Sequence, residues 1–262
     1  MKVVIFTSNA IRHKFFANKI NNYVEECMIF SESKPLDSDV TNNYQELTSI
    51  QKHFYDRFMT EKKFFEGNDT FLGETFTINR GQINSLETIE RIRKFQPDVI
   101  LVFGSSILKE EIIRLVPTGK FLNMHLGISP YYRGSGTNFW PFVNNELEFV
   151  GATILHIDPG IDTGDIVTHI RPIFEINDNV HSIGCKIIQK GTETMIKILE
   201  KIKENIEINR EKQWKVSEEK YYRMKDFDES ALKKYHQNLK NGIIKEFLQK
   251  NNSNIKLIKM KF

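Results

Sequence analysis

Short apolar runs alternate with stretches of helical hydrophobic spacing over the first two hundred residues. The runs at residues 2–6 (KVVIF), 27–30 and 99–103 are nearly free of polar side chains, which is typical of strands that are buried on both faces of a parallel sheet. Such alternation predicts an α/β domain with a mostly parallel sheet flanked by helices. Ligands of such sheets bind beyond the carboxyl ends of the strands.

The polar residues at the edges of the apolar runs predict where the helices begin. Helices are expected after the turn Thr7-Ser8-Asn9 as far as about Lys19, over about residues 44–65, from a capping box at Asn84 and Glu87, and from a cap at Asp178.

The pattern changes from about Val150. Two strand-like runs, residues 150–157 (VGATILHI) and 166–173 (IVTHIRPI), are separated by the loop DPGIDTGD at 158–165. After Lys203 the chain becomes more charged and less periodic, so a boundary is expected near residue 205. We therefore predict a catalytic domain at 1–205 and a small, partly helical C-terminal appendage at 206–262. In the appendage, residues 232–248 are expected to form one amphipathic helix that packs Leu239, Ile243 and Phe247 inward.

Charge is unevenly distributed although the formal net charge is only +3. Residues 201–262 hold 16 Lys and Arg against 9 Asp and Glu, whereas the remainder is slightly acidic. Solvated surface is the simplest explanation of a lysine-rich end, so no nucleic-acid partner is expected.

The cysteine pattern and the apolar runs indicate an intracellular protein. Cys27 and Cys185 are far apart and match no metal-ligand spacing, so reduced thiols, a cytoplasmic location and no metal are expected. The opening apolar run is too short for a leader, and no stretch is long enough to span a membrane, so no membrane partner is expected.

The candidate chemistry starts in the segment KFLNMHL at 120–126. Strand alternation places Phe121, Asn123 and His125 on one face. The loop GISPYYRGSG follows at once and can fold over that face. Taken alone, a histidine on a strand is more often structural than catalytic, and Asp162 in the 158–165 loop could be a turn former.

The stretches FLNMHLGISPYYRGSGTNFW and NNELEFVGATILHIDPGIDTGDIV closely resemble the folate-dependent formyltransferases. This family includes enzymes that act on methionyl-tRNA, on glycinamide ribonucleotide and on nucleotide-linked amino sugars. The resemblance covers roughly residues 1–200 and is strongest over 98–167. It implies a Rossmann-like sheet, 10-formyltetrahydrofolate as formyl donor, and Asn123, His125 and Asp162 as the catalytic residues.

The chemistry of formyl transfer agrees with these three residue types. Attack by an amine places negative charge on the formyl oxygen, which Asn123 and a charged His125 can stabilise by donating hydrogen bonds. His125 can also protonate the departing folate nitrogen, while Asp162 favours the imidazolium and accepts the proton of the amine, directly or through water.

Further site residues follow from the same resemblance. It implies a pterin site along the chain after the 99–103 strand and against the 158–165 loop. The turn SNAIRH lacks the phosphate-cradling glycines of several relatives, yet a phosphate can still bind at this helix N-terminus. The pterin residues implied are Ser106, Ile107, Leu108, Ile157 and Asp158, and the candidate substrate-binding residues are Arg12, His13, Tyr132 and Arg133.

Three acceptors or activities remain open at this stage. The favoured one is a nucleotide-linked amino sugar that feeds the synthesis of a surface polysaccharide such as lipopolysaccharide, because the appendage is short. Methionyl-tRNA is the second, although its enzymes usually carry a longer RNA-binding barrel. The third is hydrolysis of the formyl folate, or ligand binding without turnover. A homodimer formed through the appendage is also left open.

Overall fold

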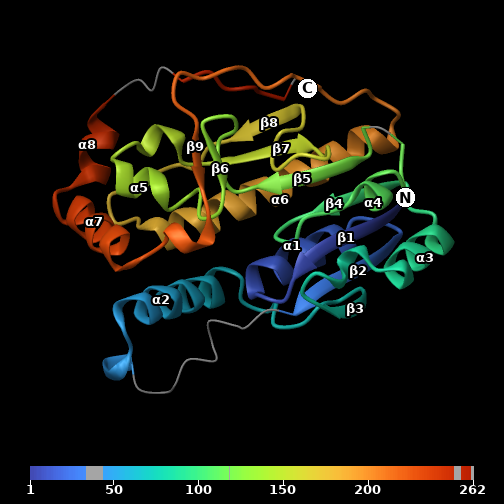
Figure 1. Cartoon of the computed structure of the whole chain (residues 1–262), viewed down its shortest axis with the longest axis horizontal. Coiled ribbons are helices and arrows are strands. Elements are labelled where there is room, and N and C mark those ends of the chain that lie inside the picture. Colours follow the sequence, from blue (N-terminus) through green and yellow to red (C-terminus); the bar gives the residue numbers. More distant parts are fainter. Residues whose placement is uncertain (34–43, 118, 251–254, 261–262) are drawn as a thin grey trace.

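The computed structural model describes residues 1–33, 44–117, 119–250 and 255–260. Its main sheet has the strand order β3-β2-β1-β4-β5-β7-β8 (Figure 1). The pairings from β3 through β5 are parallel, whereas β7 is antiparallel to both of its neighbours, β5 and β8. These strands are β1 (Lys2–Ser8), β2 (Glu26–Ser33), β3 (Glu74–Asn79), β4 (Val99–Val102), β5 (Phe121–His125), β7 (Ala152–His156) and β8 (Ile166–Ile170).

Helices cover both faces of this sheet, as the sequence predicts. The α-helices are α1 (Ile11–Asn21), α2 (Ser49–Phe64), α3 (Leu86–Phe95), α4 (Glu110–Ile113), α5 (Trp140–Asn144), α6 (Val180–Lys203), α7 (Glu229–Lys240) and α8 (Ile243–Gln249). Short 3₁₀ turns are η2 (Tyr44–Glu46), η3 (Gln82–Asn84), η4 (Leu147–Phe149) and η5 (Met224–Asp226).

Alternate residues of β1 show how the layers form. Val3 and Ile5 belong to an apolar cluster that includes residues of α1 and α6, whereas Val4 and Phe6 belong to a second cluster that includes residues of α3 and α4. Because successive strand residues point to opposite faces, one run of apolar residues contributes to both cores. The resulting three layers confirm the predicted α/β class.

The switch point of the sheet positions the site. Strand β1 pairs with β2 on one side and with β4 on the other, so the chain direction across the sheet reverses between β1 and β4. Crevices outside the carboxyl ends of strands at such a reversal are the usual ligand sites of open α/β sheets.

Some predicted caps are wrong in detail. The N-cap of α1 is Ala10, while the Thr7 hydroxyl donates to the carbonyl of Phe103 at 2.8 Å. Helix α3 is capped by Ser85, and Asn84 instead bridges two groups of the chain after β4. Helix α6 is capped by Asn179, which lies next to the predicted Asp178. Adjacent polar residues compete for such caps, so sequence fixes them only to within a residue or two.

The single helix predicted at 232–248 is also wrong: α7 ends at Lys240 and α8 begins at Ile243. Gly242 lies between them with φ 85°, a left-handed conformation that ends a helix. Leu239, Ile243 and Phe247 nevertheless all contact the core, as expected.

Residues after α6 contact the rest of the chain at several points. The short strand β9 (Lys220–Tyr222) pairs in parallel with β6 (Tyr132–Gly134), and Glu211 bridges to Ile166 of β8. Figure 1 shows α7 and α8 beside α5, and the backbone N–H of His169 in β8 donates to the carbonyl of Ile258 at 2.8 Å. A functional division of the chain at residue 205 stays a prediction. Within the described residues, every helix is too short or too polar to cross a membrane.

Candidate functional site

Strand β5 carries the first two site residues. Leu122 and Met124 point into the apolar cluster beside α6. Asn123 and His125 occupy the alternate positions and both reach the carboxylate of Asp162, which confirms that they share a face. Asn123 pairs with Val102, the last residue of β4, so the polar face lies at the carboxyl end of the parallel strands.

Asp162 lies in the loop between β7 and β8. Its Oδ1 accepts a hydrogen bond from Asn123 Nδ2 at 3.2 Å, and its Oδ2 lies 3.3 Å from His125 Nδ1. The three predicted catalytic side chains therefore converge, although Asp162 is 39 positions away from Asn123. Asp162 has a left-handed backbone with φ 53°, which is uncommon outside glycine.

His125 is 7% exposed and has an acceptor at each ring nitrogen. Nε2 lies 3.2 Å from the carbonyl oxygen of Tyr132, which can only accept a hydrogen bond, so Nε2 is the donor. Nδ1 faces the Asp162 carboxylate on the other side. Contacts at both ring nitrogens therefore fix the orientation of the imidazole.

Gly127 makes room for this ring. A Cβ at position 127 would lie 2.5 Å from His125 Nε2 and 2.8 Å from the Thr137 side chain. Any larger residue would displace the imidazole or the loop that follows it.

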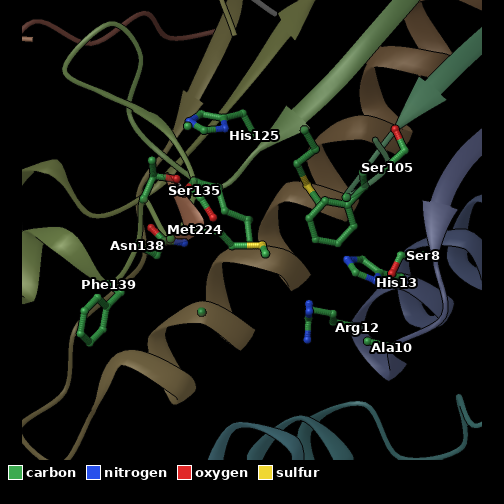
Figure 2. Close-up of a pocket in the computed structure, with 18 of the residues that line it drawn as sticks. Ser8, Ala10, Arg12, His13, Ser105, His125, Ser135, Asn138, Phe139 and Met224 are labelled. Carbon is green, nitrogen blue, oxygen red and sulfur yellow. Dashed lines mark hydrogen bonds between the residues drawn. The ribbon is translucent and has the colours of Figure 1, made fainter. Parts of the chain in front are cut away.

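A cavity of about 920 Å³ opens in front of the three side chains (Figure 2). All five residues predicted to hold the pterin line it: Ser106, Ile107, Leu108, Ile157 and Asp158. In Figure 2, Ser105 lies on the same side as His13, while Ser135 and Asn138 lie across the cavity.

Two polar side chains fix the chain after β4. Glu32, whose side chain is fully buried, accepts hydrogen bonds from the backbone N–H groups of Gly81 and Ser106. Asn84 accepts from the N–H of Lys109 at 2.7 Å and donates to the carbonyl of Ile107 at 2.9 Å. These hydrogen bonds hold the backbone beside the cavity in place. Backbone groups that are to recognise a ligand must be fixed in this way.

The four candidate substrate-binding residues divide into two pairs. Arg12 and His13 line the cavity, and Arg12 is held by Glu61 at 2.8 and 2.9 Å. Tyr132 and Arg133 are not among the described lining residues. The Tyr132 hydroxyl is buried and donates to Glu146, and Arg133 pairs with Glu219. The structure thus places one pair at the cavity and the other in the β6 strand beside it.

Another part of the cavity lining consists of residues that sequence reasoning did not assign to a site. His53 and Phe54 come from α2, His181 from α6, Phe139 from the start of α5, and Phe227 from the segment after η5. His53 contacts the rings of Phe139, His181 and Phe227 at centroid distances of 4.5–5.5 Å. We call these five residues the aromatic wall. Arg12, Arg57 and Arg223 also line the cavity.

The two histidines of the aromatic wall are held neutral. Burial, assisted by the charge of Arg57, lowers the pKa of His53 to about 4. Burial, followed by the effect of His53, lowers the pKa of His181 to about 2. At neutral pH both rings therefore present uncharged aromatic surface. Among the residues that the structure describes, no group of three or more His, Cys, Asp or Glu side chains is arranged to hold a metal ion.

The chain is similar in sequence to known methionyl-tRNA formyltransferases. The chain is 33% identical over 122 residues to the methionyl-tRNA formyltransferase of Caldanaerobacter subterraneus, covering 46% of this chain and 39% of that one. It is 32% identical over 166 residues to the methionyl-tRNA formyltransferase of Clostridium tetani, covering 62% and 51%. The chain thus spans about half or less of the length of these relatives.

A solved structure has the same overall fold. The N-formyltransferase of Helicobacter canadensis, described in complex with folinic acid and dTDP-3-aminofucose, superposes with a TM-score of 0.58 at 21% identity, over 94% of this chain and 82% of that one. The family model described as formyl transferase matches residues 17–199, well over half of the chain, which include all three converging side chains. The chain therefore belongs to the formyl transferase family.

Proposed function

We propose that this protein transfers a formyl group from 10-formyltetrahydrofolate to the amine of a nucleotide-linked amino sugar. The observation that carries the proposal is the convergence of Asn123, His125 and Asp162 at the wall of a large cavity. An amide, an imidazolium and a carboxylate are the groups that direct attack of an amine on a formyl carbon requires.

Each side chain has a distinct part in this reaction. Asn123 and His125 donate hydrogen bonds to the formyl oxygen as negative charge develops on it. Asp162 accepts the proton that the attacking amine loses, directly or through a water molecule. His125 gives a proton to the folate nitrogen as the bond between that nitrogen and the formyl carbon breaks. The new amide bond replaces the broken one, so no covalent enzyme intermediate is required.

The chain after β4 suits the folate donor. Residues Ser106, Ile107 and Leu108, together with Ile157 and Asp158 of the facing loop, form one side of the cavity. Glu32 and Asn84 hold this side in place, so its backbone groups are fixed before a pterin binds. Preorganisation of this kind lowers the cost of binding.

The aromatic wall and the three arginines support a nucleotide as the carrier of the acceptor amine. Aromatic and neutral imidazole rings offer stacking surface for a base, and guanidinium groups suit a diphosphate. The related fold described with dTDP-3-aminofucose is consistent with this acceptor class. We place the reaction in the cytoplasm, as a step toward a surface polysaccharide.

Methionyl-tRNA is the second candidate acceptor, because the relatives matched by sequence are methionyl-tRNA formyltransferases. Those matches cover 39% and 51% of the relatives' lengths. Transfer to charged initiator tRNA would require an extended basic surface and a steep salt dependence of binding.

The test is incubation of purified protein with 10-formyltetrahydrofolate and a panel of UDP- and dTDP-linked amino sugars, followed by mass spectrometry. A gain of one CO on a nucleotide sugar is the expected result. Formylation of methionyl-tRNA alone, or release of formate without any acceptor product, would overturn the proposal. The His125→Ala variant serves as the control for transfer that is not enzymatic.

A further inference from the structure

We propose that Gln213 is a positioning residue for formyl transfer, because it holds the backbone of Asp162 where the carboxylate reaches both Asn123 and His125. Gln213 lies beyond the residues that the family model matches. The inference rests on the proposed function for its activity measurement and on the structure alone for its geometry.

The backbone of Asp162 needs support. Its φ of 53° lies in the left-handed region, which residues with a Cβ populate sparsely and which persists when surrounding contacts hold it. The contacts of Asp158 with Gly160 and Thr163 lie within the same loop, so they do not fix the loop relative to β5.

Gln213 supplies hydrogen bonds from outside the loop. Its Nε2 donates to the carbonyl of Asp162 at 2.7 Å and to the carbonyl of Gly164 at 2.9 Å. The amide nitrogen has two N–H groups, so one side chain satisfies both carbonyls. Its Oε1 is buried and has no hydrogen-bond partner among the described residues, so Gln213 acts here as a donor.

The segment that carries Gln213 is itself fixed to the sheet. Two residues earlier, Glu211 exchanges backbone hydrogen bonds with Ile166 of β8 at 2.7 and 3.0 Å. One residue later, the ring of Trp214 lies 5.9 Å from Tyr131 and 6.1 Å from His169 between centroids. Gln213 is therefore anchored on both sides, as a residue that positions another must be.

The same stretch of chain also supports the histidine. Strand β9 pairs Lys220 with Tyr132 of β6, and the Tyr132 carbonyl is the acceptor for His125 Nε2. The residues after α6 thus contact the supports of two catalytic side chains. Gln213 is the member of this arrangement that a single substitution can test without removing packed surface.

The variant to measure is Gln213→Met, which keeps the length of the side chain and removes both N–H donors. The expected result is a fall in kcat of about 10- to 100-fold with KM values unchanged, because small displacements of a catalytic group cost rates of that order. Gln213→Lys keeps an N–H donor at similar reach and is expected to recover part of kcat. Gln237→Met is the matched control, since Gln237 lies on α7 and its side chain donates to Asn241 just after that helix, away from the loop.

A second measurement needs no substrate. At acidic pH, where an imidazole carries a proton on both nitrogens, the His125 Nδ1 proton facing Asp162 is expected to give a downfield N–H signal in the ¹H NMR spectrum, assigned by its loss in His125→Gln. Gln213→Met should lose this signal while Gln237→Met retains it. A folded Gln213→Met protein with the signal and kcat of the unaltered protein would overturn the inference, whereas absence of formyl transfer in the unaltered protein would overturn only the proposed function.

Discussion

The two sides of the cavity differ in how the chain builds them. The side with Asn123, His125 and Asp162 comes from one strand and one loop of the sheet, and its polar groups are hydrogen-bonded to one another. The aromatic wall comes from α2, α5, α6 and the segment after η5, and it is mostly uncharged. In the proposed function, the chemistry therefore belongs to one strand and one loop, whereas recognition of the acceptor is distributed over several elements. Substitutions on the two sides should therefore change different kinetic constants.

The largest expected effect is on the catalytic side. Asn123→Ala removes a donor for the developing oxyanion, so kcat should fall about 10²–10³-fold while acceptor binding persists. The measurements are the rate of formyl transfer and, by calorimetry, the affinity of the variant for the acceptor. An unaltered kcat in a correctly folded variant would remove Asn123 from the mechanism.

Gly127→Ala tests the same side of the cavity by crowding the ring of His125. The added methyl would lie 2.5 Å from His125 Nε2, so the ring must move away from Tyr132 or Asp162. We expect kcat to fall about 10- to 100-fold. The measurement is steady-state kinetics beside a thermal unfolding curve, and wild-type kcat in this variant would show that the ring position is not critical.

The aromatic wall predicts a pH dependence of stability. The native pKa of His53, about 4, lies below its unfolded value of about 6.5, so between these values the unfolded state binds more protons. The free energy of unfolding should therefore fall by about 2 kcal/mol for this residue as the pH drops from 7 to 5. Denaturant unfolding at both pH values is the measurement.

Replacement of His53 isolates the contribution of this residue to the loss of stability at low pH. His53→Phe keeps a ring within its aromatic neighbours and should reduce the loss of stability on acidification. The exposed His236 provides the control: it is the smallest of the three causes that lower the pKa of His53, so His236→Gln should leave most of the loss in place. Equal loss in His53→Phe and in the unaltered protein would contradict a neutral, buried His53.

The smallest expected effect concerns acceptor binding. Phe54→Ala or Phe227→Ala removes stacking surface, so acceptor KM should rise about tenfold with little change in kcat. Phe64→Ala is the matched control, because Phe64 is exposed at the end of α2. A fall in kcat with unchanged KM would mean that the aromatic wall does not serve the acceptor.

Periodicity predicted most of the sheet because most of its strands are short, largely apolar runs. The strand β3 was missed, since its sequence ETFTIN at the edge of the sheet is short and largely polar. The break between α7 and α8 was missed as well, because apolar spacing continues across Gly242 and the pattern says nothing about its backbone.

The convergence of the three polar side chains was predictable and the aromatic wall was not. Asn123 and His125 share a strand, so alternation alone places them together, and the family resemblance added Asp162. His53 and Phe227 meet only through packing of α2 against the C-terminal region. In the sequence, His53 is one polar position within a predicted helix, and Phe227 is one aromatic residue in a charged stretch. The sequence contains no pattern that indicates Gln213, because the role proposed for it depends on contacts with two backbone carbonyls of a distant loop.

The most direct test of the central claim is the rate of a single enzymatic turnover with Asp162→Asn. This substitution keeps the shape of the side chain but cannot accept the proton of the amine or stabilise the imidazolium. We predict that formyl transfer slows about 10²-fold or more with the affinities for folate and acceptor retained. Transfer at the unaltered rate would contradict a mechanism in which Asn123, His125 and Asp162 act together.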